Sequence, residues 1–240
     1  MNPLMAFTIV ALLGASVASG GESQPAHWQA AEEIATHIAP ADNAYAHKDC
    51  FIKWKGPDSD RFENRTDCSD FLNLLLEHVY RLTPAKLYRL TGHQRPTATA
   101  WFDAVGTDKA AGFLAPMTNV PDLRIGDLIF IKYPPGEPDT GHVMIVARTP
   151  IERQESLPLV PGTKQWAVQV IDSSKSGHGP TDTRHQTDNT FARGVGKGLF
   201  RLYTNADGSV AGYSWSVVKK SKFVPVSEHA VRFARITPPN

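Results

Sequence analysis

The chain has 240 residues, of which 41% are hydrophobic and 20% are charged, and its formal net charge is +1. This composition suits one globular domain. The nearly neutral charge and the absence of a basic stripe give no argument for nucleic acid as a partner. The sequence has no internal repeat, no low-complexity tract and no phosphate-binding glycine loop.

The first 20 residues are predicted to be a cleavable signal peptide. An apolar run extends from Leu4 to about Val17 and is followed by small residues, as at a signal-peptidase site. The run is shorter than the roughly 20 residues that span a bilayer, and no other segment is long and apolar enough to cross a membrane. We therefore expect a secreted or periplasmic protein with a single domain over residues 21–240 and no stable membrane insertion after cleavage.

The first half of this domain is predicted to be helical. Apolar residues at helical spacing indicate a helix in 26–39. Residues 54–66 are rich in Gly, Pro, Asp and Asn and are predicted to form a loop. A second helix follows in 68–82, capped by Thr66 or Asp67. Pro84 and Gly92 are expected to break the next segment, and a short helix is predicted in 97–106.

The second half is predicted to consist of strands. Short apolar or alternating runs bounded by turn residues occur in 126–133, 142–148, 166–174, 198–218 and 230–236. The long run contains Ala206-Asp207-Gly208, which is typical of a hairpin turn. Helices followed by a meander of antiparallel strands predict an α+β fold.

Cys68 is the first candidate for chemistry, because it falls at the first turn of the second predicted helix. The first N–H groups of a helix have no intrahelical acceptor, and the helix dipole places partial positive charge there. Both effects favour a thiolate, which is the nucleophilic form of cysteine. The same N–H groups can bind a developing oxyanion.

His142 and Asp172 are the predicted partners of this cysteine. A cysteine nucleophile needs a base, and His142 begins a predicted strand directly after a glycine-containing turn. Asp172 lies at the end of the next predicted strand. If the two strands are antiparallel neighbours, Asp172 lies beside His142 and can fix its tautomer.

Each candidate also has an interpretation without catalysis. Cys68 could form a disulfide with Cys50, since an exported protein meets an oxidising compartment. His142 could be a strand-edge histidine, and Asp172 could be a turn aspartate. A further group could hold a metal, but its spacing fits no standard zinc pattern, so we predict a solvated loop there; its members are His178, Asp182 and His185.

Taken together, these motifs resemble those of the NlpC-type bacterial cell-wall cysteine peptidases, with the CHAP-type amidases as near relatives. The motif around the cysteine is Asp67-Cys68-Ser69-Asp70-Phe71, and the histidine follows a strand that begins Gly126-Asp127-Leu128. Trp54 and Gly56 match an upstream motif of the family. Three positions depart from the pattern: Asp70 replaces a glycine, Ile52 replaces a tyrosine that would donate to the oxyanion, and Asp172 replaces a more usual His, Asn or Gln.

The resemblance implies a papain-like fold, in which the nucleophile helix packs on an antiparallel sheet or half-barrel. It implies cleavage of amide bonds in peptidoglycan stem peptides, or in another peptide substrate, through a Cys68 thioester. His142 would act as base, Asp172 would orient it, and Trp54 and Asp70 would lie at the substrate. No cofactor or metal is expected. An acyltransferase or amidase with another substrate, and a non-catalytic exported binding module on the same fold, remain open.

Overall fold

The computed structural model describes residues 24–238. The predicted signal peptide therefore lies outside the described residues. The described α-helices are α1 (Ala26–His37), α2 (Cys68–Tyr80), α3 (Pro84–Thr91) and α4 (Ala98–Ala104), and two short 3₁₀ helices are η1 (Pro40–Asp42) and η2 (Val120–Asp122). Across this part of the chain, no helix combines the length and the apolar character that a bilayer crossing requires.

The strands form two sheets. The small sheet has the order β1-β3-β2 and consists of β1 (Asn43–Ala44), β2 (Phe51–Lys53) and β3 (Glu63–Arg65). The large sheet has the order β11-β10-β9-β8-β6-β5-β12-β4, and β7 pairs with β8 outside this path. Its strands are β4 (Leu114–Met117), β5 (Leu128–Lys132), β6 (Gly141–Val146), β7 (Ile151–Arg153), β8 (Lys164–Ser174), β9 (Gly194–Thr204), β10 (Val210–Ser214), β11 (Phe223–Pro225) and β12 (Ala230–Ile236).

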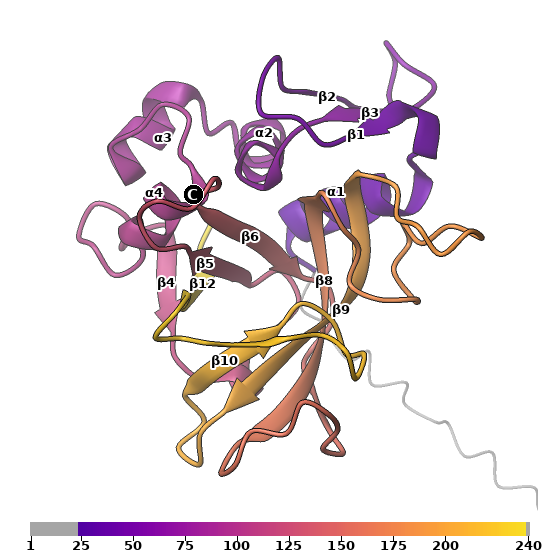
Figure 1. Cartoon of the computed structure of the whole chain (residues 1–240). Coiled ribbons are helices and arrows are strands. Elements are labelled where there is room, and N and C mark those ends of the chain that lie inside the picture. The colour runs from indigo at the N-terminus through magenta and orange to yellow at the C-terminus, as the bar shows by residue number, and fades with distance from the viewer. Residues whose placement is uncertain (1–23, 239–240) are drawn as a thin grey trace, which may run out of the picture.

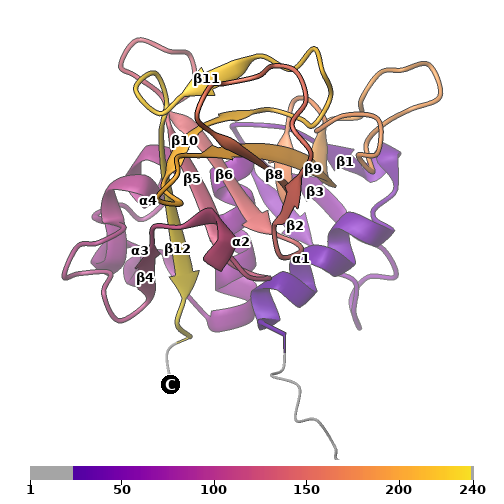
Figure 2. The same cartoon turned by 90° about the horizontal axis from the view of Figure 1, so that it is seen from below.

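All strand pairs of the large sheet are antiparallel. Helices α1 and α2 and the small sheet lie over one side of it, and β10 runs across in front of β8 and β9 as the sheet curls (Figure 1). The view from below shows α1 and α2 beneath the sheet and β11 on its opposite side (Figure 2). The α+β prediction is therefore confirmed.

The two faces of the large sheet are buried against different partners. Successive side chains of a strand point to opposite faces, and along β5 Phe130 packs in the cluster that includes the helices, whereas Ile129 and Ile131 pack in a second cluster. On β6, Val143 belongs to the helix side and Met144 to the second cluster. The central strands are buried on both faces, which explains why their sequences are almost continuously apolar.

Helix α2 begins at the position that the sequence indicated. The Asp67 side chain accepts a hydrogen bond from the Asp70 backbone N–H at 2.8 Å, as an N-cap does. Phe71, Leu72, Leu75 and Leu76 of this helix are buried in the core cluster on the helix side of the sheet. The helix ends at Arg81, which adopts the left-handed conformation at φ 55° and so terminates the helical hydrogen bonding.

Two segments of the first half differ from the sequence prediction. The segment 54–66, predicted as loop, contains β3, whose central Asn64 bonds to Asn43 and Ala44 of β1. The segment between Pro84 and Gly92 is helix α3 rather than a break. Pro84 occupies the first turn and Gly92 the left-handed C-cap, which are the positions in a helix that these residues favour.

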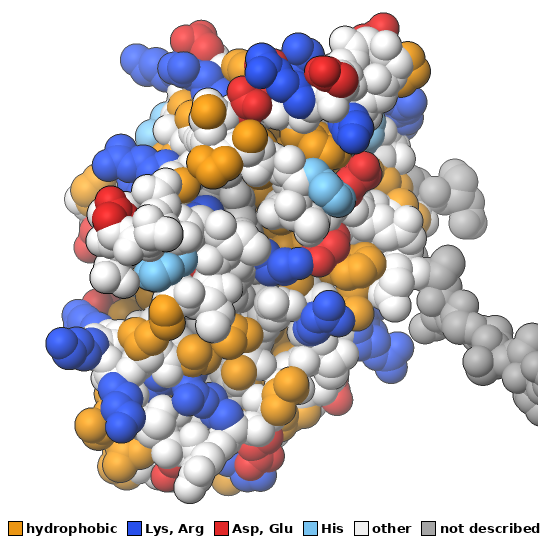
Figure 3. Space-filling view, turned by 90° about the vertical axis from the view of Figure 1, so that its right-hand side faces the viewer, with side chains coloured by type: hydrophobic (Ala, Val, Ile, Leu, Met, Phe, Trp, Pro, Cys, Tyr) orange, Lys and Arg blue, Asp and Glu red, His pale blue; other side chains and the backbone are white. Residues whose placement is uncertain are grey.

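The face of the molecule that includes α1 and the small sheet has no large patch of a single charge sign. Lys and Arg side chains alternate with acidic and small hydrophobic groups over it (Figure 3). This mixture agrees with the formal net charge of +1.

Candidate active site

The candidate site lies where the start of α2 meets the ends of β6 and β8. Cys68 is the first residue of α2, His142 the second residue of β6, and Asp172 the third from the end of β8. Strands β6 and β8 are antiparallel, with Ile145 opposite Ile171. The beginning of β6 therefore lies beside the end of β8, as the sequence argument required.

His142 and Asp172 also point to the same side of the sheet. His142 shares its face with Met144, and Asp172 shares its face with Val170, because side chains alternate along a strand. Met144 and Val170 lie in one core cluster. The His142 Nε2 atom is 2.6 Å from Asp172 Oδ2, and both side chains are almost fully buried.

His142 presents its other ring nitrogen to Cys68. Its Nε2 is engaged by Asp172, so Nδ1 is the nitrogen that remains for the Cys68 thiol, which interacts with the imidazole. The residue before the histidine must be glycine. Gly141 has φ 151°, and a Cβ there would lie 2.1 Å from the carbonyl oxygen of Ile131. The Cys68 Sγ atom lies 4.0 Å from the Gly141 carbonyl oxygen.

The charges of the three groups support one another. Burial by itself would lower the pKa of His142, but the negative charge of Cys68 and the hydrogen bond to Asp172 outweigh burial and raise the pKa to about 9. Burial would raise the pKa of Asp172, but Arg184, His178 and His142 hold it well below its ordinary value. The arrangement therefore favours an ionised Asp172 and a protonated His142.

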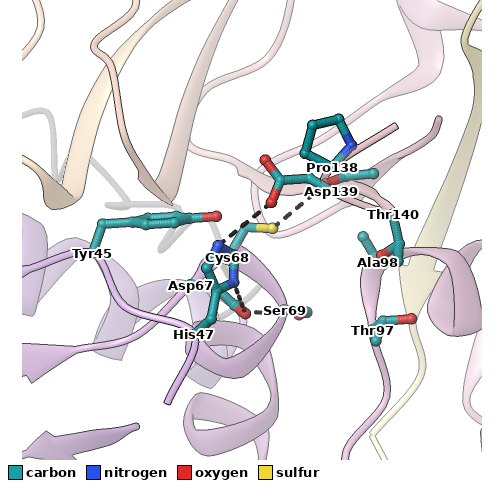
Figure 4. A pocket seen from close by; sticks show the side chains of 11 residues that line it. Tyr45, His47, Asp67, Cys68, Ser69, Thr97, Ala98, Pro138, Asp139 and Thr140 are labelled. Atoms are coloured by element: carbon teal, nitrogen blue, oxygen red, sulfur yellow. Dashed lines mark hydrogen bonds and ion pairs between the residues drawn. The ribbon is translucent and has the colours of Figure 1, made fainter. Parts of the chain in front are cut away.

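A small cavity of about 190 Å³ opens onto Cys68. Figure 4 shows that Tyr45 lies along one side of the cavity with its hydroxyl directed toward Cys68. Burial, with the charges of Cys68 and Asp67, raises the pKa of Tyr45, so its phenol keeps its proton. The remaining lining residues are His47, Asp67, Ser69, Thr97, Ala98, Pro138, Asp139, Thr140 and Gly141.

Sequence analysis did not identify Tyr45. The motif comparison looked for a tyrosine at Ile52, which lies in β2 and packs against the core cluster of the helices. Tyr45 follows β1 directly, seven positions earlier in the chain. The short parallel pairing of β1 with β3, which leads into α2, brings it to the cysteine. Only this non-local pairing, which has no signal in the sequence, could have located it.

One wall of the cavity is held by an ion pair and by two contacts of His47 with carboxylates. Asp139 lies on the segment between β5 and β6, and its carboxylate is 2.9 Å from Lys175 Nζ and 3.4 Å from His47 Nε2. His47 Nδ1 is 3.0 Å from Asp67 Oδ2. The segment after β1 is thereby joined across the mouth of the cavity to the segment before β6 (Figure 4).

A second cavity, of about 620 Å³, adjoins the first. Thr97 and Thr140 line both cavities. The wall between them is fixed in part by the Thr99 hydroxyl, which donates to the Thr140 carbonyl at 2.5 Å. The other lining residues come from the ends of α3 and α4 and the segments after them: Leu90, Thr91, His93, Ala100, Asp103, Ala104, Thr107, Asp108 and Lys109.

Two predicted substrate-binding residues do not line either cavity. Trp54 stacks on His78 near the other end of α2, with ring centroids 4.1 Å apart. Asp70 is buried and paired with Arg95, whose Nε donates to Asp70 Oδ1 at 2.6 Å. The placement of Trp54 and Asp70 does not support a contact with substrate. Asp70 instead holds the segment of Arg95 against α2.

Cys50 and Cys68 are both free thiols, so the disulfide considered from the sequence is not formed. The Cys50 sulfur lies 3.3 Å from the Ala46 carbonyl oxygen, and it accepts a hydrogen bond from Arg95 Nη2 at 3.1 Å. Burial, together with the Asp70 carboxylate, raises the pKa of Cys50 to about 12. The environment of Cys50 therefore opposes formation of its thiolate.

The segment predicted as a solvated loop is buried at some of its polar side chains and exposed at others. His178, Asp182 and Arg184 are almost fully covered, and His178 and Arg184 both approach Asp172. The predicted solvation is wrong for His178 and Asp182, because the apolar strands on either side gave no indication that these side chains fold back over the strand ends, whereas His185 stays partly exposed. Within 24–238, no group of three or more side chains has the arrangement of a metal site.

The fold and site define an α+β protein with a Cys–His–Asp arrangement at the start of a helix. No family model matches the chain, and no solved structure matches it. The chain is 34% identical over 193 residues to the uncharacterized protein R653 of Acanthamoeba polyphaga mimivirus, an alignment that covers 76% of this chain and 83% of the viral protein. The chain therefore belongs to the same family as this mimivirus protein.

Proposed function

We propose that this protein is an exported, papain-like cysteine hydrolase that cleaves amide bonds. The observation that carries the proposal is the approach of His142 to Cys68 at the start of a helix, with His142 Nε2 held 2.6 Å from the buried Asp172 carboxylate. A helix that begins at a cysteine and packs on an antiparallel sheet bearing His and Asp supports the papain-like assignment.

The reaction follows from these positions. The Cys68 thiolate attacks the amide carbonyl carbon, and the oxyanion is met by the Cys68 backbone N–H and the Tyr45 hydroxyl. The C–N bond then breaks as the departing amine takes the proton from His142 Nδ1. The neutral imidazole next removes a proton from water, the resulting hydroxide attacks the thioester, and the C–S bond breaks to restore the thiolate and the imidazolium. Asp172 holds the Nε2–H throughout.

The resemblance of the motifs to those of the NlpC-type peptidases makes peptidoglycan stem peptides the first substrate class to test. The same acyl-enzyme would also serve an acyltransferase, in which an amine replaces water as the acceptor. A non-catalytic binding module receives no support from the cysteines, because neither is bound to the other.

The decisive experiment is alkylation of the chain from residue 21 by iodoacetamide across a range of pH, without reductant. Mass spectrometry of the two cysteine peptides makes Cys50 an internal control in the same molecule. We expect Cys68 to react rapidly even below about pH 8.5, where an ordinary thiol is protonated, and Cys50 to react slowly.

Hydrolysis is then measured on soluble peptidoglycan fragments, with the release of new amino groups as the signal. Cys68→Ser and His142→Ala should abolish the release, whereas Cys50→Ser should retain it. Equal and slow alkylation of both cysteines, or full hydrolysis by Cys68→Ser, would overturn the proposal.

A further inference from the structure

Asp172 accepts from two histidines at one carboxylate oxygen. Its Oδ2 lies 2.6 Å from His142 Nε2 and 3.0 Å from His178 Nε2. Its Oδ1 lies 2.9 Å from Arg184 Nη2. The orienting role assigned to Asp172 in the proposed function needs only His142, so the second histidine requires its own explanation.

The hydrogen bonds of His178 define its protonation. Its Nδ1 lies 2.7 Å from the Trp215 carbonyl oxygen, and a carbonyl oxygen only accepts, so Nδ1 carries a proton. Its Nε2 lies 3.0 Å from the Asp172 carboxylate, which is also paired with the Arg184 guanidinium, so Nε2 faces an acceptor as well. Both ring nitrogens of His178 therefore face acceptors, which is the hydrogen-bonding pattern of an imidazolium.

The surrounding chain holds His178 in place. The His178 backbone N–H donates to Asp182 Oδ2 at 2.7 Å, and Asp182 Oδ1 accepts from Arg184 Nε at 2.9 Å. Two glycines of β9 make the space: a Cβ at Gly198 would lie 2.4 Å from Asp182 Oδ2, and one at Gly196 would lie 2.4 Å from Arg184 Nε. The segment therefore closes tightly over the end of β8.

Trp215 covers both histidines. Its ring centroid lies 4.9 Å from that of His142 and 4.6 Å from that of His178. This cover keeps water from the two hydrogen bonds at Asp172, where each charge acts at short range in a poorly screened environment. A change in the charge of His178 therefore changes the pKa of His142 through the Asp172 carboxylate that lies between them.

We propose that His178 is a positioning residue, a second imidazolium that acts through Asp172 to set how tightly His142 holds its proton. By offsetting part of the Asp172 charge, His178 allows His142 to release its proton to the departing amine, while the shared oxygen keeps His142 Nε2 occupied and Nδ1 directed at Cys68. This inference rests on the proposed function, since it assigns His178 to the same relay.

Several charged or titratable groups lie near the His142 imidazole and can influence its pKa. They come from α2, from the segments on either side of the cavity, and from β8 and the segment after it: Cys68, Tyr45, Tyr133, Asp139, Asp172, His178, Asp182 and Arg184. Among these, His178 is the one that touches the carboxylate oxygen bound to His142.

The test is ¹⁵N NMR of the histidine rings in the whole chain from residue 21, which reports charge and tautomer directly. In the wild type, His178 should show two protonated nitrogens at pH 7. In His178→Gln the midpoint of the His142 titration should rise by about one pH unit, of the order expected for loss of one nearby charge. His185→Gln, a change in the same segment away from Asp172, should leave the midpoint unchanged.

A double-mutant comparison separates this role from a structural one. In an Asp172→Asn background, His178→Gln should no longer move the His142 midpoint, because the carboxylate that connects them is gone. A neutral His178 in the wild type, an unmoved midpoint, or a shift that persists in Asp172→Asn overturns the inference. Failure of the proposed function would appear separately, as slow alkylation of Cys68 with the histidine titrations intact.

Discussion

At the scale of the residue, the two cysteines differ in their surroundings, and this difference explains why only Cys68 is expected to react. Cys68 lies at a helix start and interacts with His142, a group that can hold positive charge. Cys50 is half-buried beside the Asp70 carboxylate, which opposes its ionisation. The same side chain is therefore prepared for reaction at one position and protected from it at the other.

His142 sets a testable limit on activity at alkaline pH. Its pKa is raised to about 9, so the imidazolium that protonates the leaving amine persists as the pH rises to that value and is lost above it. We expect amide hydrolysis to fall above about pH 9, while alkylation of Cys68 does not fall because the thiolate remains. Parallel pH profiles of the two reactions measure this, and a decline of both together would contradict it.

Tyr45 offers a second prediction at this scale. Its phenol stays protonated and faces the cavity at Cys68, so it can donate to the oxyanion. Tyr45→Phe should lower kcat by about 100- to 1000-fold, the usual effect of removing one such donor. The alkylation rate of Cys68 should change little, since that reaction forms no oxyanion. Tyr88→Phe, at an exposed position on α3, is the matched control, and an unchanged kcat in Tyr45→Phe would exclude the role.

At the scale of the element, the parts of the site that lie within one short stretch of sequence could be predicted. The contacts that bring distant stretches together mostly could not. The start of α2 was predictable because its cap, its apolar face and Cys68 all lie within one short stretch. The pairing of His142 with Asp172 was predictable because antiparallel neighbours bring a strand start beside a strand end.

The remaining parts of the site depend on contacts between distant segments. Tyr45 reaches the cavity through β1, a strand of two residues, which is too short to leave a periodic signal. His178 and Arg184 lie in a polar segment whose burial depends on the glycines of β9. Trp54 and Asp70 were assigned by motif spacing alone; they contact His78 and Arg95 and line neither cavity.

The segment after β8 should contribute strongly to stability. Arg184 is almost fully buried between the carboxylates of Asp172 and Asp182. Arg184→Met leaves both carboxylates without their shared cation, and removal of one partner from a buried ion pair costs about 3–5 kcal/mol. Urea unfolding measures this loss. Arg193→Met, at an exposed position in the same segment, should change the free energy of unfolding by less than about 0.5 kcal/mol.

At the scale of the whole molecule, two neighbouring cavities lie beside the helices, and the first of them opens onto the nucleophile. The cavity at Cys68 holds only about 190 Å³, whereas the adjoining cavity beside α3 and α4 holds about 620 Å³. A peptide substrate that extends several residues beyond the cleaved bond needs more space than the first cavity provides. The shared wall of Thr97 and Thr140 makes the second cavity its natural extension.

A side chain that fills the second cavity should therefore slow the cleavage of long substrates more than that of short ones. In Thr99→Trp the indole would occupy the space beside α4, and we expect kcat/KM for a long peptide substrate to fall by at least about tenfold, as misfit in a binding pocket does. Alkylation of Cys68 by iodoacetamide, which needs only the first cavity, should keep its rate. Thr99→Val is the matched control, since it removes the hydroxyl that bonds to Thr140 without filling the space. An equal loss in Thr99→Val would assign the effect to the wall between the cavities, and an unchanged kcat/KM in Thr99→Trp would show that the substrate leaves Cys68 in another direction.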